Sequence, residues 1–188
     1  MVRHGETDWN RENRFQGHAD PPLNDAGRAQ ARELAGRLDG EPVAVAYTSP
    51  LERAHETAQI VCRRLGVELH VSASLMEVDV GSWSGLTRAE VEARFPDGYR
   101  RWLDYGHGWD DGESYDELGE RVVSGLLEIA ARHPEELVLA VTHGGPIRSA
   151  LAASAGVRFG EARRSIAILE NCAAVRMTVE SGALQAVH

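Results

Sequence analysis

Short apolar runs with strand character alternate along this chain with segments of helical character. Residues 43–47 and 137–141 are almost continuously apolar, which predicts two strands that are buried on both faces. Residues 67–71 and 173–179 are weaker strand candidates. Buried strands separated by helices form a mostly parallel sheet with helices on either side. The pattern therefore predicts an α/β fold, a single three-layer α/β/α domain over residues 1–188.

Capping residues indicate where the intervening helices begin. Three segments have the spacing of a capping box: Ser49 with Glu52, Thr87 with Glu90, and Ser114 with Glu117. Pro50 fits the first position of the helix after Ser49, and Asn24 is expected to cap an earlier helix. In the helix after Ser114, one face carries the apolar residues Leu118, Val122, Leu126, Ile129 and Ala130.

The composition excludes several classes of partner and chemistry. The net charge of −9 opposes binding to nucleic acid or to a membrane surface, because both are anionic. No apolar stretch is long enough to span a bilayer and no leader peptide is evident, so we expect a cytoplasmic enzyme. The chain has no lysine, which excludes a Walker A loop, a pyridoxal phosphate Schiff base and a kinase ATP site.

We expect no metal ion and no cofactor. Cys62 and Cys172 are far apart in sequence and lack a CxxC motif, so we expect two free, buried thiols. Two histidines, His18 and His107, are candidates for contacts with a substrate. None of the histidines outside the motifs described below has the spacing of metal ligands: His18, His55, His70, His107, His133 and His188.

Three separate segments have the residues needed to bind and transfer a phosphoryl group. They are Arg3-His4-Gly5-Glu6-Thr7, Ser49-Pro50-Leu51-Glu52-Arg53 and Thr142-His143-Gly144-Gly145. The second and third follow the two predicted buried strands, so they are expected at the same edge of the sheet. Arg53 lies near a helix start, where free N–H groups and positive potential favour an anion. The planar guanidinium group of arginine can also donate two hydrogen bonds at once to the oxygens of a phosphate.

Histidine suits phosphoryl transfer because its neutral ring is nucleophilic near physiological pH. Its ordinary pKa is about 6.5, and neighbouring guanidinium groups disfavour the charged form. The same groups neutralise charge on the transferred phosphoryl oxygens, so a metal is not required. A leaving alkoxide needs a proton from a carboxylic acid, but spacing alone does not show which acid supplies it. Nor does spacing rank His4 above His143.

Two features of the chain stand apart from the repeating pattern. Residues 77–116 are richer in Gly, Trp and Asp, and we expect this excursion to cap the site, with its aromatic residues packed inside it. Only Met1 and Val2 precede Arg3. The strand that delivers His4 is therefore either unusually short or continued by residues upstream of Met1.

With these motifs placed, the whole chain resembles the histidine phosphatase superfamily, in its branch of small phosphoglycerate mutase-like phosphatases. Members of that family usually have several apolar residues before the Arg-His-Gly motif. The resemblance depends on these residues in this order: Arg3 to Thr7 with Asn10; Gln16-Gly17; Pro22-Leu23-Asn24; Ser49 to Ala54 with Thr57-Ala58; Glu77, Gly81, Trp83 and Gly85-Leu86; Gly112-Glu113-Ser114; and Thr142 to Gly145.

The resemblance implies specific roles. His4 would be the nucleophile that becomes phosphorylated, and Glu77 the general acid and then the general base. Arg3, Arg53 and His143 would complete the phosphate pocket. Further contacts to the substrate or its phosphate are implied for Asn10, Gln16, Gly17 and the backbone of Gly144.

We expect a metal-independent phosphatase that hydrolyses phosphomonoesters of small metabolites. The alternative is a phosphoglycerate mutase with the same pocket, although mutases of the family carry longer insertions after the acid. A third hypothesis is a phospho-ligand binding domain without activity. Sugar phosphates, phosphoglycerate derivatives, α-ribazole phosphate and nucleotides all remain candidate substrates, and the sequence leaves a homodimer open.

Overall fold

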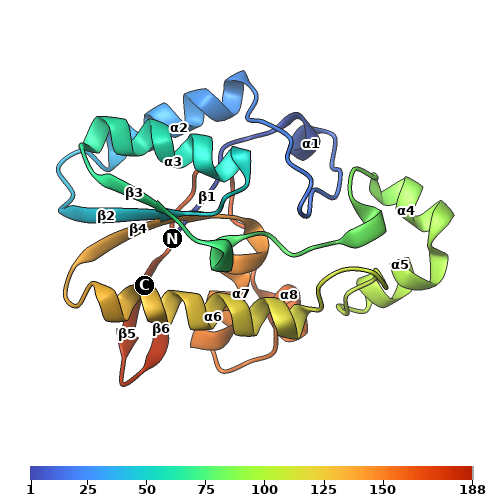
Figure 1. The fold of residues 1–188 in the computed structure, drawn as a ribbon. Coiled ribbons are helices and arrows are strands. Elements are labelled where there is room, and N and C mark those ends of the chain that lie inside the picture. Colours follow the sequence, from blue (N-terminus) through green and yellow to red (C-terminus); the bar gives the residue numbers. More distant parts are fainter. Residues whose placement is uncertain (188) are drawn as a thin grey trace.

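A four-stranded parallel sheet forms the centre of the computed structural model, which describes residues 1–187 (Figure 1). Its spatial order is β1 (Val2–Arg3), β4 (Leu137–Thr142), β2 (Val43–Thr48) and β3 (Glu68–Val71). The last four residues of β2 and of β4 are all buried. Both predicted buried strands are therefore confirmed, and each extends one residue further, to a threonine.

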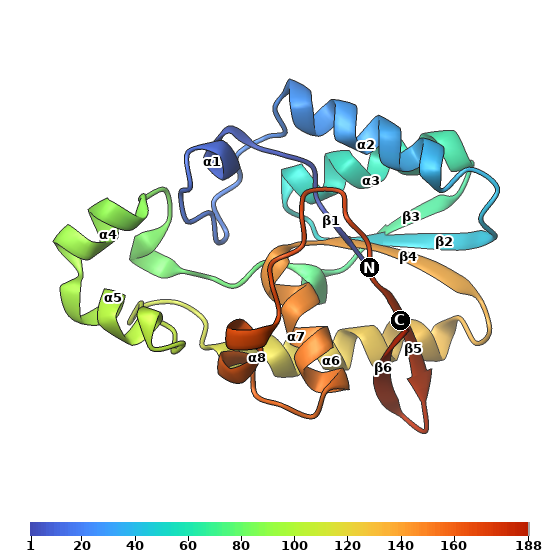
Figure 2. The same ribbon diagram turned by 180° about the vertical axis from the view of Figure 1, so that it is seen from behind.

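Helices cover both faces of this sheet. In Figures 1 and 2, α2 (Asp25–Arg37) and α3 (Glu52–Leu65) lie on one side of it. On the other side lie α6 (Tyr115–Arg132), α7 (Gly144–Ser154) and α8 (Phe159–Ser165). The three-layer α/β/α architecture is confirmed. A short helix, α1 (Asp8–Arg11), follows β1.

The side chains of each strand alternate between two hydrophobic cores. Ala46, Leu139 and Val141 pack with α2 and α3, whereas Tyr47 and Ala140 pack on the opposite face. This period of two is the geometry of a β-strand, whose successive side chains point to opposite faces. Because the side chains on both faces of β2 and β4 are apolar, both faces have to be covered by helices.

The prediction of a strand at residues 173–179 needs correction. The strand is β5 (Arg176–Glu180), and it pairs antiparallel with β6 (Ala183–Val187) in a separate hairpin. Figure 2 shows this hairpin projecting away from the central sheet. Four of the five residues of β5 are exposed, so the segment lacks the two buried faces that a central strand requires. Gly182, at φ 79°, supplies the left-handed turn.

The predicted helix starts are confirmed with one exception. Thr87 and Ser114 form capping boxes, and the Asn24 side chain accepts a hydrogen bond from the Gly27 N–H. Ser49 is not an N-cap: α3 begins at Glu52. The Glu52 N–H donates instead to Asp20 Oδ1 at 2.6 Å. The cap of α3 thus comes from a loop that is distant in sequence.

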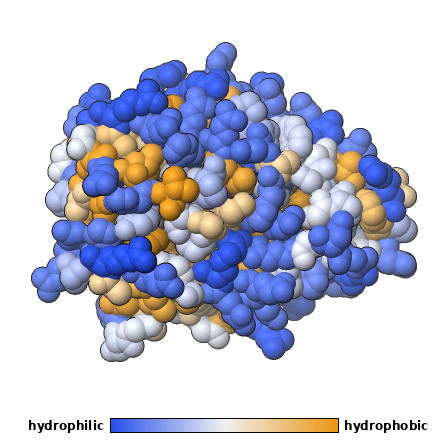
Figure 3. All heavy atoms as spheres, viewed as in Figure 1, coloured by the Kyte–Doolittle hydropathy of each residue, from blue (hydrophilic) through white to orange (hydrophobic). Residues whose placement is uncertain are grey.

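Residues 77–116 leave the sheet and return to α6. They contain two short helices, α4 (Arg88–Arg94) and α5 (Pro96–Leu103), which lie to one side of the sheet in Figure 1. Two 3₁₀ turns, η1 (Ala73–Leu75) and η2 (Gly81–Trp83), precede them. Trp83 and Trp109 are buried, as predicted, and belong to the same core as Tyr47 of β2 and Leu118 of α6. Hydrophilic side chains cover most of the face shown in Figure 3, and apolar ones form small scattered groups.

Candidate active site

The carboxyl ends of three strands deliver the predicted residues to one edge of the sheet. His4 follows β1, Ser49 follows β2 and His143 follows β4. The His4 N–H donates to the Thr142 carbonyl at 2.9 Å, which continues the pairing of β1 with β4. On its other side, Arg3 donates from its backbone to the Ala173 carbonyl at 3.1 Å. A strand of two residues is thus held from both sides.

The two imidazoles lie together in the interior. The ring centroids of His4 and His143 are 5.1 Å apart, and the two residues are 2% and 0% exposed. His4 Nδ1 is 2.6 Å from the Gly5 carbonyl oxygen. Because a carbonyl only accepts, Nδ1 carries the proton and the lone pair is on Nε2. The backbone therefore fixes the tautomer that a nucleophilic Nε2 requires.

Ser49 contacts His143 rather than capping a helix. Its hydroxyl oxygen lies 2.8 Å from His143 Nε2 and accepts a weaker bond from the Leu51 N–H at 3.3 Å. The hydroxyl proton of Ser49 is then free to be donated to His143 Nε2. This arrangement favours a proton on His143 Nδ1, which has no hydrogen-bond partner among residues 1–187. His143 thus has a buried donor suited to an anion.

Burial and positive charge keep both rings neutral. Loss of hydration lowers the pKa of His4 well below its ordinary value, and the charges of Arg53 and Arg3 lower it further. The Gly5 carbonyl opposes this shift. Burial likewise lowers the pKa of His143, with Arg53 the next contributor. The same two guanidinium groups therefore act on both imidazoles.

The Arg53 side chain is fully buried, which is unusual for an arginine. Its Nη1 donates to the Ala19 carbonyl and its Nη2 to the Gly17 carbonyl, each at 2.8 Å. Burial lowers the pKa of Arg53 to about 10, partly opposed by the negative charges of Glu77 and Asp20. The group therefore remains positively charged at neutral pH, and the carbonyls orient its fork.

Buried polar atoms without a partner concentrate at this site. Within the part of the chain that the structure describes, five buried side-chain atoms lack a hydrogen-bond partner, and four belong to predicted site residues. They are Arg3 Nε, Arg53 Nε, His143 Nδ1 and Gln16 Oε1. The first three are donors, and a 180° turn of the Gln16 amide would make it one as well. Such a set of donors fits a phosphate group, whose oxygens only accept.

Glu77 reaches the site through backbone contacts. Its Oε1 accepts from the N–H groups of Val78 at 2.9 Å and Gly145 at 3.1 Å. A Cβ on Gly145 would overlap Oε1, so the glycine permits this approach. Glu77 also attracts the charges of Arg3 and Arg53. The carboxyl therefore lies within electrostatic range of both guanidinium groups.

The four residues implied to make further contacts with the substrate or its phosphate have different surroundings. Gly17, at φ 51°, presents its carbonyl to Arg53, and Gly144 is the first residue of α7. Asn10 Oδ1 accepts from the Thr7 N–H at 3.0 Å in a capping box of α1, which leaves its amide N–H groups for other partners. Gln16 contributes the unpartnered oxygen described above.

One charged residue near the site, Arg148, was not predicted from the sequence. This partly buried arginine on α7 donates from Nε to the Ile166 carbonyl at 3.2 Å. Burial lowers its pKa, and so does the nearby charge of Arg163, whereas Tyr115 and Glu77 raise it. No carboxylate of residues 1–187 lies within ion-pair distance of Arg148. Arg148 lies four residues after Gly144, about one helical turn, so the two residues share a face of the helix. This spacing was the sequence signal that could have indicated Arg148.

Two hollows elsewhere on the surface are distinct from this cluster. One, of about 350 Å³, lies between β3 and α6, and the other, of about 510 Å³, lies between α6, α7 and α8. Neither is lined by His4, His143, Arg53 or Glu77. Over residues 1–187 there is no cluster of three His, Cys, Asp or Glu side chains arranged to hold a metal ion. None of the helices described is both long and apolar enough to cross a bilayer.

A parallel α/β sheet with two neutral imidazoles and two guanidinium groups at its carboxyl edge defines a phosphoryl-transfer enzyme. Comparison with known families agrees with this class. The sequence profile of the histidine phosphatase superfamily, branch 1, matches residues 1–188, and the chain belongs to this family.

Relatives of the chain include phosphatases of known name. It is 36% identical over 159 residues to phosphoserine phosphatase 1 of Hydrogenobacter thermophilus, covering 84% of this chain and 75% of that one. It is 39% identical over 155 residues to the metal-independent phosphoserine phosphatase of Arabidopsis thaliana, covering 79% and 65%. Among solved structures, Bacillus stearothermophilus YhfR superposes with a TM-score of 0.91 at 31% identity, over 98% of this chain and 92% of that one. The protein is a phosphoric monoester hydrolase of the histidine phosphatase type.

Proposed function

We propose that the protein hydrolyses phosphomonoesters of small metabolites through a phosphohistidine on His4. The observation that carries this proposal is the buried, neutral His4 ring, whose Nδ1 is bound to the Gly5 carbonyl and whose Nε2 retains its lone pair. Arg3, Arg53 and His143 would bind the phosphate oxygens. We also propose that residues 77–116 cap this pocket.

The reaction has two steps. Nε2 of His4 attacks phosphorus, the ester O–P bond breaks, and the protonated Glu77 carboxyl donates its proton to the leaving oxygen. The Glu77 carboxylate then takes a proton from water, which attacks the phosphohistidine. The N–P bond breaks, its electron pair returns to Nε2, and inorganic phosphate leaves. The guanidinium groups neutralise the phosphoryl oxygens in both steps, so no metal is needed.

Arg148 supports a preference for substrates with a second anionic group. It is a partly buried cation without a carboxylate partner among the described residues, and it lies within electrostatic range of Glu77. A substrate carboxylate would pair with it. Phosphoserine, the substrate in the names of two relatives, carries both a phosphate and a carboxylate. We therefore propose phosphorylated metabolites that also bear a carboxylate as the substrate class.

The test is phosphate release from a panel of phosphorylated metabolites by wild type and by His4→Ala. His70→Ala is the control, because His70 lies on β3 with a partly exposed side chain. We expect His4→Ala to abolish turnover, and chelators and His70→Ala to leave it intact. Undiminished activity of His4→Ala would refute the mechanism. Isotopic tracing of 2- and 3-phosphoglycerate tests the reaction type, since interconversion without release of phosphate would show a mutase.

A further inference from the structure

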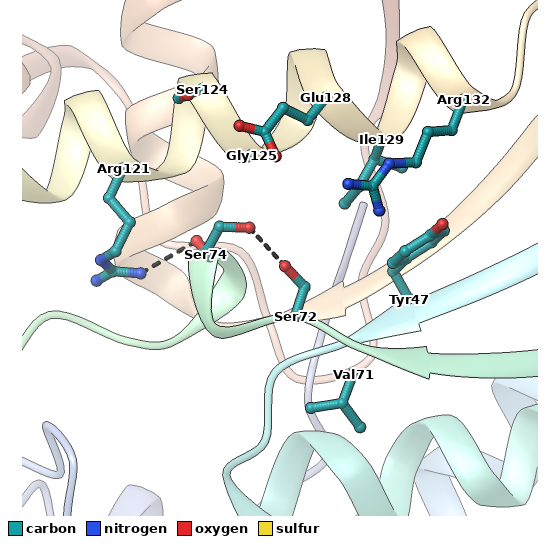
Figure 4. Close-up of a pocket in the computed structure, with 10 residues that line it drawn as sticks. All are labelled: Tyr47, Val71, Ser72, Ser74, Arg121, Ser124, Gly125, Glu128, Ile129 and Arg132. Atoms are coloured by element: carbon teal, nitrogen blue, oxygen red, sulfur yellow. Dashed lines mark hydrogen bonds between the residues drawn. The ribbon is translucent and has the colours of Figure 1, made fainter.

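A single arginine on α6 holds the backbone that leads to Glu77. Figure 4 shows the Arg121 side chain reaching from this helix to Ser74 on η1. Arg121 donates to four backbone carbonyls in this segment: from Nη1 to Ala73 (3.3 Å), Ser74 (3.0 Å) and Met76 (3.1 Å), and from Nη2 to Glu77 (3.4 Å). One guanidinium thus spans the segment from η1 to the proposed acid.

Two other side chains complete this set of contacts. Thr142, the last residue of β4, donates from its hydroxyl to the Leu75 carbonyl at 2.6 Å. His18 Nε2 donates to the Glu77 carbonyl at 2.8 Å. Every carbonyl from residue 73 to residue 77 therefore accepts a hydrogen bond from a side chain. Apart from the 3₁₀ turn η1, residues 73–77 lack regular secondary structure, and their carbonyls need such partners to hold one conformation.

Glu113 closes the arrangement on the far side of Glu77. Its two carboxylate oxygens accept from Arg121 Nε at 2.8 Å and Nη2 at 2.7 Å, a bidentate pair. The two side chains are only 15% and 26% exposed, for Glu113 and Arg121 respectively. The Glu113 N–H also donates to the Asp79 carbonyl at 2.9 Å. Glu113 is thereby fixed to the chain two residues beyond Glu77.

The sequence explains why these two residues meet. Ser114 caps α6, so Glu113 is the residue just before the cap. Arg121 comes seven positions after Ser114, which is two helical turns or about 10.5 Å along the axis, and it returns to the same face. The long arginine side chain can then reach back toward Glu113 and across to η1. No step of the proposed reaction uses either residue.

We propose that Arg121 and Glu113 are positioning residues for the general acid, which fix the backbone on both sides of Glu77. The inference rests on the role of Glu77 in the proposed function. A carboxyl displaced by about 1 Å from its reacting partner loses on the order of 10²-fold in rate. The ion pair with Arg121 thus explains the presence of Glu113, the one acid of the Gly112-Glu113-Ser114 motif.

The test compares kcat/KM for two substrates that differ in their need for a proton. Phosphoserine has an alkoxide leaving group, whereas 2,4-dinitrophenyl phosphate releases a stable anion that needs no acid. The variants are Arg121→Gln, Glu113→Gln and Arg121→Lys, with Glu77→Gln as the reference. Arg28→Gln is the matched control, because Arg28 forms a comparable pair with Glu56 through Nε at 2.7 Å and Nη2 at 3.2 Å.

We expect Arg121→Gln to lower kcat/KM for phosphoserine about 10²-fold, and for the dinitrophenyl ester less than about 3-fold. Arg121→Lys should lose less kcat/KM for phosphoserine than Arg121→Gln does, since lysine keeps the positive charge but not the planar guanidinium group. Arg121→Gln added to Glu77→Gln should cause little further loss, because residues that act as a unit are not additive. The control should leave both substrates unchanged.

Equal losses on both substrates, or fully multiplicative losses with Glu77→Gln, would overturn the inference. The ratio of the two kcat/KM values does not depend on how much enzyme is folded. If Arg121→Gln does not fold, Glu113→Gln and Arg121→Lys supply the same ratio. If Glu77→Gln itself slows both substrates equally, the role of Glu77 in the proposed function fails, and the inference fails with it.

Discussion

Two buried, neutral histidines should make the stability of this protein fall as the pH is lowered from 7.5 to 5.5. Burial is the main cause of the lowered pKa of both His4 and His143. In the unfolded chain each ring regains an ordinary pKa of about 6.5. Between the two pKa values the unfolded state therefore binds more protons than the folded state. Stability contributed by each ring is present above pH 6.5 and is lost as the pH falls below it.

The size of the effect follows from the linkage relation. A ring that stays neutral in the folded state loses on the order of 1 kcal/mol of stability over these two pH units, and the pair roughly twice as much. A domain of ordinary stability has about 5–15 kcal/mol in total, so this loss is measurable. Replacing one ring with asparagine, which does not titrate, should remove about half of it.

The assay is urea unfolding at pH 7.5 and 5.5 of wild type, His4→Asn and His143→Asn, with His70→Asn as the control. Titrating groups distant from the substituted ring contribute about equally to all four proteins and cancel in the differences. Each buried-site variant should lose on the order of 1 kcal/mol less than wild type over this range, and the control should behave as wild type. An identical loss in all four proteins would refute the argument that both rings are buried in the neutral form.

Three further predictions concern the site and its supports. Arg53→Lys should lower kcat/KM about 10- to 10²-fold in a phosphate-release assay, because an ammonium group cannot replace the planar guanidinium and its paired hydrogen bonds. An unchanged kcat/KM would contradict the proposed role of Arg53. Gly145→Ala should lower turnover of phosphoserine about 10²-fold, because its Cβ would overlap Glu77 Oε1. Gly119→Ala, a helical position with nothing within 4 Å, is the control and should retain activity. Ser114→Ala removes the cap of α6 and should lower stability by about 1 kcal/mol, or the Tm by about 2–4 °C in calorimetry.

The apolar runs were sufficient to predict the sheet and the edge where its motifs meet. Residues 43–47 and 137–141 have no charged interruption, which favours strands covered on both faces. Parallel strands place their carboxyl ends at one edge, which brings Ser49 and His143 together without knowledge of the loops. The hairpin β5–β6 was not predictable as a separate unit, because its alternating polar residues do not show which sheet it joins.

Long-range polar contacts account for what the sequence could not show. Ser49 had the spacing of a cap, but Asp20 caps α3 and the serine hydroxyl meets His143 instead. The choice of Glu77 among many acids depended on the family resemblance, since its loop has no periodic pattern. Its position depends on Arg121, which is distant in sequence. Capping and periodicity patterns describe only residues close together in sequence, so they do not predict contacts of this kind.

The central claim is that His4 accepts the phosphoryl group within a pocket formed with Arg3, Arg53, His143 and Glu77. The most direct measurement is mass spectrometry of the enzyme after rapid alkaline quenching during turnover of 2,4-dinitrophenyl phosphate, since phosphohistidine survives in alkali. We expect one phosphoryl group on the peptide that contains His4, and more of it in Glu77→Gln, which lacks the base for hydrolysis. A phosphoryl group on any other residue, or turnover with none detected in either protein, would contradict it.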